Sequence, residues 1–414
     1  MSEWKQISLG NLVESISKRH AFNKDRLIFL NTSDIFNGKV LNNEYTDINT
    51  LPGQAKKSIQ KNDILFSEIR PANRRFAYID FESEDYVVST KLMVLRPKNN
   101  DILPKYLYYF LTSEESLRHL QEVAESRSGT FPQITFSEVK EMVINLPPLK
   151  EQQRIVEVID SLTEKIELNL KINETLEEMA MTLYKHWFVD FGPFQDGEFV
   201  ESELGMIPKG WEIKKLSDIV EIRTTSINPS KTPGEFYYHY SIPAYDEGKL
   251  PSLNSAESIK SNKYLIETDT VLVSKLNPAT PRIWTVYFKK ESKNKQITST
   301  EFIHYVPKQN INFAWLNCYL RSDDFQNEFK SNATGTTHSR QRVSPKVTKN
   351  FLVVIPPFDV MASFNNKVSS YFKLIDQNLK SITLLSETRD YLIPRLLSGE
   401  IDVSKAEKQV EEVL

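Results

Sequence analysis

Apolar residues recur at alternating steps of four and three along a charged stretch between residues 155 and 187. The seam that they form runs through Ile155, Ile159, Leu162, Ile166, Asn169, Asn173, Leu176, Ala180, Leu183 and Trp187. A seven-residue repeat of this kind is typical of helices that pair along their length. The pattern therefore predicts a long helix over residues 151–191, with one face suited to a partner helix.

A second seam with the same spacing lies 209 residues further along the chain and predicts a second long helix over 359–401. Each helix alone packing on its own globular part is the alternative. A seam of about 30 residues is longer than that packing requires, so we expect the two helices to pair antiparallel. The residues expected to form the helix pair are Ile159, Leu162, Ile166, Asn169, Leu176, Val368, Tyr371, Ile375, Asn378 and Leu385.

Two asparagines, Asn169 and Asn378, occupy the same position in the two seams. A polar residue in an apolar seam costs stability but fixes register and orientation. We therefore predict that this pair sets the alignment of the helices. Asn173 corresponds to Ile382 in the second seam, and we expect its side chain to face water.

The seams belong to a larger duplication, because the whole chain repeats once with a period of about 207–210 residues. Asp63–Ser67 returns as Asp269–Ser274, and Leu146–Pro148 returns as Ile355–Pro357. Seven segments recur in the same order, which chance matches do not do. The chain is therefore expected to contain two copies of one structural plan.

In each copy an α/β part precedes the long helix. Short apolar runs predict strands over 63–69, 76–81 and 86–95, and residues 104–126 predict a helix that begins at a proline. A turn-rich segment then leads to a short strand and to Pro-Pro, which separates strand from helix. The predicted fold is α/β (α+β), with globular domains 1–150 and 210–358, long helices 151–191 and 359–401, a linker 192–209 and a C-terminal tail 402–414.

The net charge of −3 conceals an uneven distribution. Residues 204–358 hold 21 Lys+Arg against 14 Asp+Glu, whereas residues 151–203 hold 4 against 13. The globular parts are basic and the segments between them are acidic, so the surface suits a polyanion. A helix of about 30 residues spans about 45 Å, and one turn of B-DNA spans about 34–36 Å. The helix pair is therefore expected to hold the basic parts about one DNA turn apart.

Signals of catalysis are weak. The 12 glycines form no phosphate-binding or dinucleotide-binding loop, and the histidines and the single Cys318 lack zinc-site spacing. Asn277–Thr280 resembles the base-gripping loop of amino-methyltransferases but lacks its second proline and its aromatic residue. The pair Glu138 and Lys140 resembles a nuclease motif that is too short to be specific. We expect no catalytic residue, no metal and no cofactor in this chain.

Residues suited to polyanion binding gather at equivalent places in both copies, after one strand and in the turn-rich segment. Arginine, glutamine, asparagine and serine hydrogen-bond base edges or phosphates. The turn-rich segments differ in sequence while their flanks match, as expected of two readers of different sequences. The candidate DNA-binding residues are Arg70, Arg74, Arg75, Arg127, Ser128, Thr130 and Gln133 in the first copy, and Lys275, Arg282, His338, Arg340, Gln341 and Arg342 in the second.

With this plan the chain resembles the specificity subunit of type I restriction-modification systems along essentially its whole length. The resemblance is carried by Leu146–Ile155, Leu183–Phe191, Ile207–Trp211 and Arg389–Ile401. The second copy departs from the pattern after its Pro-Pro, where Phe-Asp-Val-Met-Ala replaces Leu-Lys-Glu-Gln-Gln.

The resemblance implies two target recognition domains that each read one part of a split site in double-stranded DNA, and helices that set the spacer between the parts. It implies two methyltransferase subunits and restriction subunits as partners, with S-adenosylmethionine, Mg and ATP bound only by those partners. A structural adaptor without DNA readout and a fused methyltransferase or nuclease are the alternatives. The first residues lack a signal peptide and no apolar run suits a membrane helix, so we expect a cytoplasmic protein.

Overall fold

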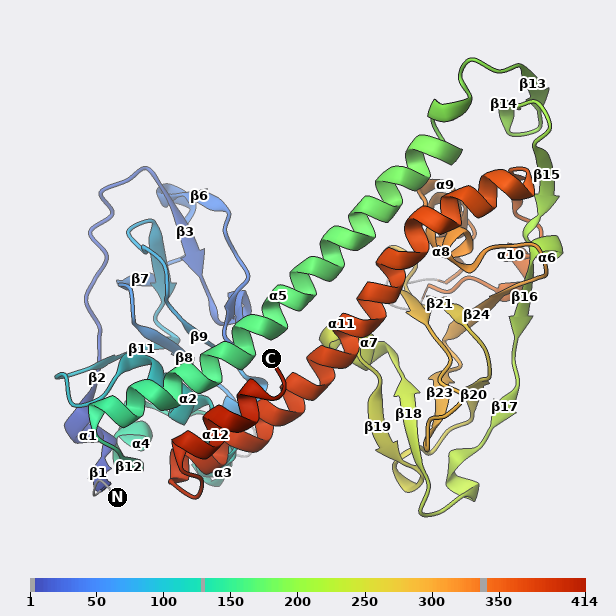
Figure 1. Ribbon diagram of the computed structural model, residues 1–414. Helices are drawn as coiled ribbons and strands as arrows, with labels where there is room; N and C mark the ends of the chain where they lie inside the picture. The colour runs from blue at the N-terminus through green and yellow to red at the C-terminus, as the bar shows by residue number, and fades with distance from the viewer. Residues whose placement is uncertain (1–3, 128–130, 336–340) are drawn as a thin grey trace. The chain divides into compact units, whose positions relative to one another are not determined.

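The computed structural model describes residues 4–127, 131–335 and 341–414 and divides into two compact units (Figure 1). Unit 1 comprises residues 1–166 and 384–414, and unit 2 comprises residues 167–383. Two long helices, α5 (Leu149–Phe188) and α11 (Phe358–Ser398), each contribute to both units. Each unit also contains one α+β domain, which confirms the predicted duplication and fold class.

Unit 1 is built on two four-stranded sheets. Its strands are β1 (Lys5–Ser8), β2 (Val13–Ser15), β3 (Arg26–Leu30), β4 (Ile35–Phe36), β5 (Lys39–Val40), β6 (Tyr45–Asp47), β7 (Ala55–Ser58), β8 (Ile64–Ser67), β9 (Phe76–Tyr78), β10 (Tyr86–Ser89), β11 (Leu92–Pro97) and β12 (Val143–Leu146). Its shorter helices are α1 (Leu9–Leu12), α2 (Pro104–Thr112), α3 (Glu114–Arg127), α4 (Phe136–Glu141) and α12 (Val403–Glu411), with 3₁₀ turns η1 (Thr32–Asp34), η2 (Ile48–Thr50) and η3 (Pro71–Asn73). The sheet orders are β2-β11-β8-β9 and β6-β3-β10-β7, and β1 pairs with β12.

Unit 2 repeats this topology. Its strands are β13 (Phe199–Ser202), β14 (Gly205–Pro208), β15 (Glu212–Lys215), β16 (Val220–Arg223), β17 (Ser226–Ile227), β18 (Phe236–Tyr240), β19 (Ser252–Ser255), β20 (Lys263–Ile266), β21 (Thr270–Ser274), β22 (Ile283–Val286), β23 (Lys295–Ser299), β24 (Phe302–Pro307) and β25 (Leu352–Ile355). Its shorter helices are α6 (Leu216–Ile219), α7 (Ile242–Gly248), α8 (Phe313–Arg321), α9 (Asp323–Ser331) and α10 (Pro345–Thr348), with 3₁₀ turns η4 (Gly192–Phe194), η5 (Pro229–Lys231) and η6 (Ala256–Ser258). The orders β16-β24-β21-β22 and β17-β20-β23-β18-β19 match those of unit 1, with β17 as an additional edge strand.

The predicted helix over 104–126 is two helices, α2 and α3. The chain leaves helical geometry at Ser113, where φ is −62° and ψ is 149°. The hydroxyl of Ser113 then accepts a hydrogen bond from the backbone N–H of Ser116, which satisfies one free donor in the first turn of α3. Apolar periodicity continues across this break, so the sequence pattern does not reveal it.

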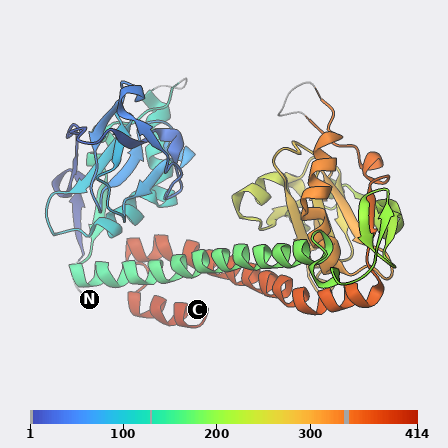
Figure 2. The same ribbon diagram turned by 90° about the horizontal axis from the view of Figure 1, so that it is seen from above.

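The two seams are largely buried, as predicted. Ile159, Leu162 and Val368 are at most 1 % exposed, and in each unit the segments of α5 and α11 lie side by side (Figures 1 and 2). In unit 2 the contacts run in opposite order along the two helices: Asn169 contacts Ser381, whereas Asn173, further along α5, contacts the earlier residue Asn378. The helices are therefore antiparallel in this unit.

The expectation that Asn173 faces water is wrong. Its side chain is 8 % exposed, and its Oδ1 accepts a hydrogen bond of 2.8 Å from Nδ2 of Asn378. Nδ2 of Asn169 donates to the Ser381 hydroxyl at 3.3 Å. Asn169 and Asn378, which are equivalent in the repeat, thus belong to two neighbouring polar contacts in the seam instead of pairing with each other.

The segments predicted as linker and tail are folded. Residues 192–209 contain the hairpin of β13 and β14, and the rings of Phe191 and Phe194 lie 5.3 and 5.1 Å from Trp211. Residues 402–414 contain α12, which lies on the side of α5 away from the sheets of unit 1 (Figure 2). Arg154 of α5 donates to both carboxylate oxygens of Glu407 in α12, at 2.9 and 2.6 Å.

Candidate nucleic-acid interface

In unit 1 the chain after β8 lies against the turn-rich segment, so the structure brings the two candidate groups together. Ile69 and Gln133 form an isolated antiparallel bridge. On either side of this bridge, the N–H of Arg70 donates to the carbonyl of Pro132 at 3.1 Å, and the N–H of Ile134 donates to the carbonyl of Glu68 at 2.9 Å. Residues far apart in sequence thereby share one short backbone ladder.

Unit 2 contains the same ladder at the equivalent place after β21. Leu276 and Arg342 form the antiparallel bridge. The N–H of Asn277 donates to the carbonyl of Gln341 at 2.9 Å, and the N–H of Val343 donates to the carbonyl of Lys275 at 3.0 Å. The two domains therefore present their candidate residues on one shared backbone arrangement.

Most arginines of the unit 1 group already have partners. Arg74 forms an ion pair with Glu114, and Arg127 forms one with Glu138. Arg75 donates to the backbone carbonyls of Ser33 and Ile35, at 3.2 and 3.0 Å, which holds the chain around η1 against β9. Arg70 is exposed, and among the described residues its guanidinium has no hydrogen-bond or ion-pair partner.

Unit 2 shows the same division. Arg282 binds Asp246 through two hydrogen bonds of 2.7 and 2.9 Å, which raise the pKa of its guanidinium. Arg342 lies 3.1 Å from a carboxylate oxygen of Glu301. Lys275 is half-buried, and its ammonium group has no polar partner within the described part of the chain. Gln133 and Gln341 are half-buried and enter the ladders through their backbones. Four candidates, Ser128, Thr130, His338 and Arg340, lie outside the described residues.

The two motifs considered as traces of catalysis have structural roles. Glu138 caps α4, because its carboxylate accepts hydrogen bonds from the N–H and the hydroxyl of Thr135 at 2.6 and 2.8 Å. Asn277 begins a tight turn, in which its carbonyl accepts from the N–H of Thr280 at 3.0 Å. Asn277 also adopts a left-handed backbone conformation with φ of 50°. That feature is not visible in sequence, and its equivalent in unit 1 is Arg70, with φ of 44°.

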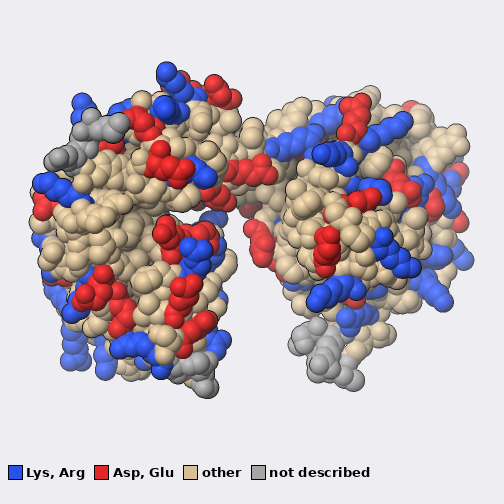
Figure 3. All heavy atoms as spheres, turned by 90° about the horizontal axis from the view of Figure 1, so that it is seen from below, with Lys and Arg blue, Asp and Glu red and all other residues tan. Residues whose placement is uncertain are grey.

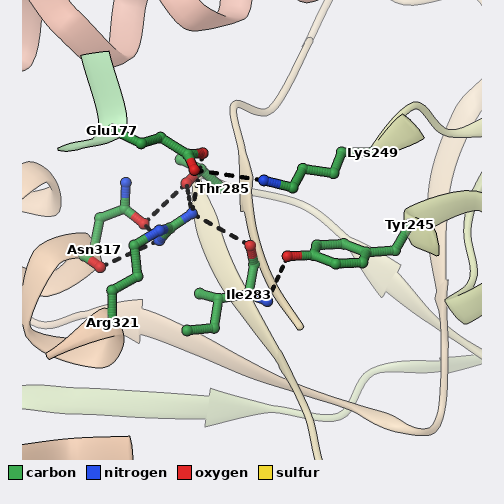
Figure 4. A network of polar contacts seen from close by, with 7 residues as sticks. All are labelled: Glu177, Tyr245, Lys249, Ile283, Thr285, Asn317 and Arg321. Carbon is green, nitrogen blue, oxygen red and sulfur yellow. Dashed lines mark hydrogen bonds and ion pairs between the residues drawn. The ribbon is translucent and has the colours of Figure 1, made fainter. Parts of the chain in front are cut away.

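A polar network attaches the domain of unit 2 to α5 (Figure 4). The Arg321 side chain, 11 % exposed, donates to the Thr285 hydroxyl at 3.0 Å and lies 3.9 Å from Glu177 of α5. The ammonium of Lys249 lies 3.4 Å from the other oxygen of Glu177. Glu177 is thus the point at which two basic residues of the domain hold the long helix.

The domain of unit 1 is held to α5 by different groups. Gln152 is fully buried, accepts from the N–H of Leu103 at 2.8 Å and donates to the carbonyls of Asp101 and Pro147 at 2.9 and 2.8 Å. Asp160 accepts from the Tyr109 hydroxyl and pairs with Lys105 at 2.8 Å. Each α+β domain is therefore fixed to α5 through side chains other than those of its ladder.

The surface charge of unit 2 agrees with the sequence distribution on one face of the molecule. On the face drawn in Figure 3, Lys and Arg of unit 2 cover more of the surface than Asp and Glu do. Among residues 4–127, 131–335 and 341–414, no group of three or more His, Cys, Asp or Glu is placed to hold a metal ion. In the same part of the chain, no helix has the length and apolar character that a membrane crossing requires.

Comparisons with known proteins agree on one family. The model described as "Type I restriction modification DNA specificity domain" matches residues 1–178 and 208–387. The chain is 34 % identical to the type I restriction enzyme HindI specificity subunit of Haemophilus influenzae, over 97 % of this chain and all of that protein. It is 28 % identical to the MjaIX specificity subunit of Methanocaldococcus jannaschii, over 75 % of this chain and 71 % of that one. The crystal structure of the type I restriction-modification S subunit from M. genitalium has the same fold, with a TM-score of 0.52, 17 % identity and 96 % of each chain covered.

Proposed function

We propose that this chain, which belongs to the type I restriction-modification DNA specificity family, reads two short blocks of double-stranded DNA, one with each α+β domain. It is a DNA specificity subunit of a type I restriction-modification system. In the proposed division of labour it contributes recognition and spacing, and it contributes no catalytic group of its own.

The observation that carries the proposal is the repeated ladder. In both units a strand end and the turn-rich segment are joined by the same backbone hydrogen bonds, at Ile69 and Gln133 and at Leu276 and Arg342. The backbone is shared, whereas the side chains on it differ. A shared frame with different hydrogen-bonding groups is what two readers of different sequences require, because base edges are distinguished by their donor and acceptor patterns.

The ion pairs also suit DNA binding. Exposed pairs such as Arg74 with Glu114 contribute little to stability, so their arginines are available to phosphates at small cost. Phosphate contacts would supply affinity that falls with salt, while a few groups on the ladders supply sequence preference.

The long helices would set the spacer and dock two methyltransferase subunits, and restriction subunits would join through these. Both helices expose large apolar side chains away from their seams, which a methyltransferase subunit packed along the helix would cover. These side chains are Leu168, Met179, Leu374, Leu384 and Tyr391, all at least 41 % exposed. S-adenosylmethionine, Mg and ATP would be bound by the partner subunits.

A domain exchange tests the proposal. Residues 1–150 are replaced by the equivalent part of a relative with a different target, and the complex with its methyltransferase subunits is used to methylate a plasmid library. Sequencing of the methylated sites should show that one block of the site changes and that the other block and the gap are kept. Change of both blocks, or of neither, would exclude one-domain, one-block reading.

A further inference from the structure

We propose that Arg70 and Asn277 are equivalent base-reading residues, with Arg70 recognising guanine in one block and Asn277 recognising adenine in the other. This inference rests on the proposed function and deepens it by naming the bases. The two residues occupy equivalent backbone positions although their side chains differ.

Both residues have a left-handed backbone, with φ of 44° at Arg70 and 50° at Asn277, and both precede a buried proline, Pro71 and Pro278. Their N–H groups donate to the carbonyls of the turn-rich segment, at 3.1 and 2.9 Å. The strand ends before them are held alike. The hydroxyls of Ser67 and Ser274 accept from the N–H two residues later, at 3.1 and 3.3 Å.

A second anchor precedes each position. The N–H of Glu68 donates to the carbonyl of Lys91 at 3.2 Å, and the N–H of Lys275 donates to the carbonyl of Glu301 at 2.9 Å. The Cα atoms of Arg70 and Asn277 are therefore fixed between two anchored strands. A rigidly placed Cα is what allows a side chain to discriminate among bases, because the hydrogen bonds of recognition tolerate little displacement.

At Arg70 the left-handed conformation opens the turn η3, in which the carbonyl of Arg70 accepts from the N–H of Asn73 at 2.8 Å, and Arg74 at the other end of this turn has φ of 53°. Asparagine tolerates positive φ because its short amide bonds to the nearby backbone, whereas arginine gains nothing of this kind and glycine would avoid the cost. Strain that the surrounding structure maintains is typical of functional positions. Arg70 is also exposed and lacks a polar partner among the described residues, whereas Arg74 and Arg127 are ion-paired.

The side chains of Arg70 and Asn277 offer different patterns of hydrogen-bond donors and acceptors to a base. A guanidinium offers paired donors that match the O6 and N7 acceptors of guanine in the major groove. A carboxamide offers one donor and one acceptor, which match N7 and the amino group of adenine. Among the described residues, the amide of Asn277 has only a long hydrogen bond of 3.4 Å to the Thr280 hydroxyl, so it can exchange that partner for a base at little cost.

The test uses the full complex with methyltransferase subunits and a library of duplexes randomised at the methylated site. Arg70→Gly and Asn277→Gly remove the side chains while permitting positive φ. Arg118→Ala, at an exposed arginine of α3, and Asn350→Ala, at an exposed asparagine, are matched controls. Domain exchange first assigns each block to its domain.

We expect Arg70→Gly to lower the preference for one G·C pair in the unit 1 block by roughly 5- to 150-fold, leaving the other block unchanged. Asn277→Gly should do the same at one A·T pair of the unit 2 block, and the controls should change neither. In the exchange variants Arg70→Asn and Asn277→Arg, the preferred base at those pairs should change toward adenine and guanine. These variants report a new preference and so do not depend on loss of activity.

Three results would overturn the inference. A unit 1 block that contains no G·C pair excludes Arg70 as a guanine reader. Uniform weakening at all sequences, with a smaller salt dependence, makes Arg70 a phosphate contact. A motif unchanged by the glycine and exchange variants excludes both residues. If the unaltered complex shows no two-block motif, the proposed function itself fails, which is distinguishable from failure of these assignments.

Discussion

Replacing the paired seam asparagines of unit 2 by leucine tests separately their effect on the free energy of unfolding and their effect on the gap between the two DNA blocks. The variants are Asn173→Leu, Asn378→Leu and the double variant, with Asn366→Leu on the exposed side of α11 as a control. In the protein, Asn378 donates to Asn173 at 2.8 Å inside the seam, and Nδ2 of Asn173 is buried without a partner in the described structure.

The magnitudes follow from these contacts. A buried amide that loses its partner costs about 1–3 kcal/mol, whereas removal of both partners costs little. A buried leucine contributes about 1.5–3 kcal/mol. Each single variant gains a buried leucine but leaves the other amide without its partner. Because these two effects are of similar size, the free energy of unfolding should change little. The double variant should be more stable than the sum of the single effects predicts, by about 2 kcal/mol.

Urea unfolding followed by helical circular dichroism measures the four free energies, and sequencing of methylated sites measures the gap. If the asparagines fix register, the double variant should methylate sites with more than one gap length, although it is the most stable. The Asn366→Leu control should keep one gap. Additive stabilities within about 0.5 kcal/mol, together with a single gap in the double variant, would refute the reasoning.

Three further predictions concern stability. Gln152→Ala should lower the free energy of unfolding by about 2–3 kcal/mol in urea melts, because three hydrogen bonds are lost, whereas exposed Gln153→Ala should not. Glu177→Gln should lower the unfolding temperature of unit 2 in calorimetry. The decrease should be smaller when the same change is made in an Arg321→Met background, because the charges of Glu177 and Arg321 interact. Burial lowers the pKa of His304 to about 3, whereas the unfolded chain binds a proton at this residue below a pKa of about 6.5. The free energy of unfolding should therefore fall from pH 6.5 to pH 5, and in pH-dependent urea melts this fall should be smaller by about 1.6 kcal/mol in His304→Phe.

The long helices and their seams were predictable because a heptad pattern depends only on local spacing. The error at Asn173 shows the limit of that argument. Asn169 and Asn378 are equivalent in the repeat. In an antiparallel helix pair, however, residues later in one helix contact residues earlier in the other. Asn173 therefore meets Asn378, and Asn169 meets Ser381. A repeat alignment identifies equivalent residues, whereas only the three-dimensional register identifies neighbours.

The structure brings together the two segments that hold the candidate residues in each unit, but the sequence did not show which of their side chains have partners, and their contact with DNA stays a prediction. Spacing along the chain places arginines after a strand, but it does not show that Asp246 binds Arg282 or that two backbone carbonyls bind Arg75. These partners come from distant segments or from the backbone. The left-handed positions Arg70 and Asn277 also depend on long-range ladders, so composition and periodicity carry no sign of them.

The division between side chains with strong polar partners and side chains without them suggests how one backbone arrangement would serve two targets in the proposal. Arg75 and Arg282 are tied to carbonyls or to a carboxylate, and they keep the frame in shape. Arg70 and Asn277 occupy equivalent positions on the backbone ladders, and their side chains make few polar contacts within the described residues. In the proposal, a change at the reading position would alter the target while the ladder, which is formed by backbone groups, is kept. In the same proposal, duplication followed by such changes would yield two blocks of different sequence, and the long helices would keep one gap.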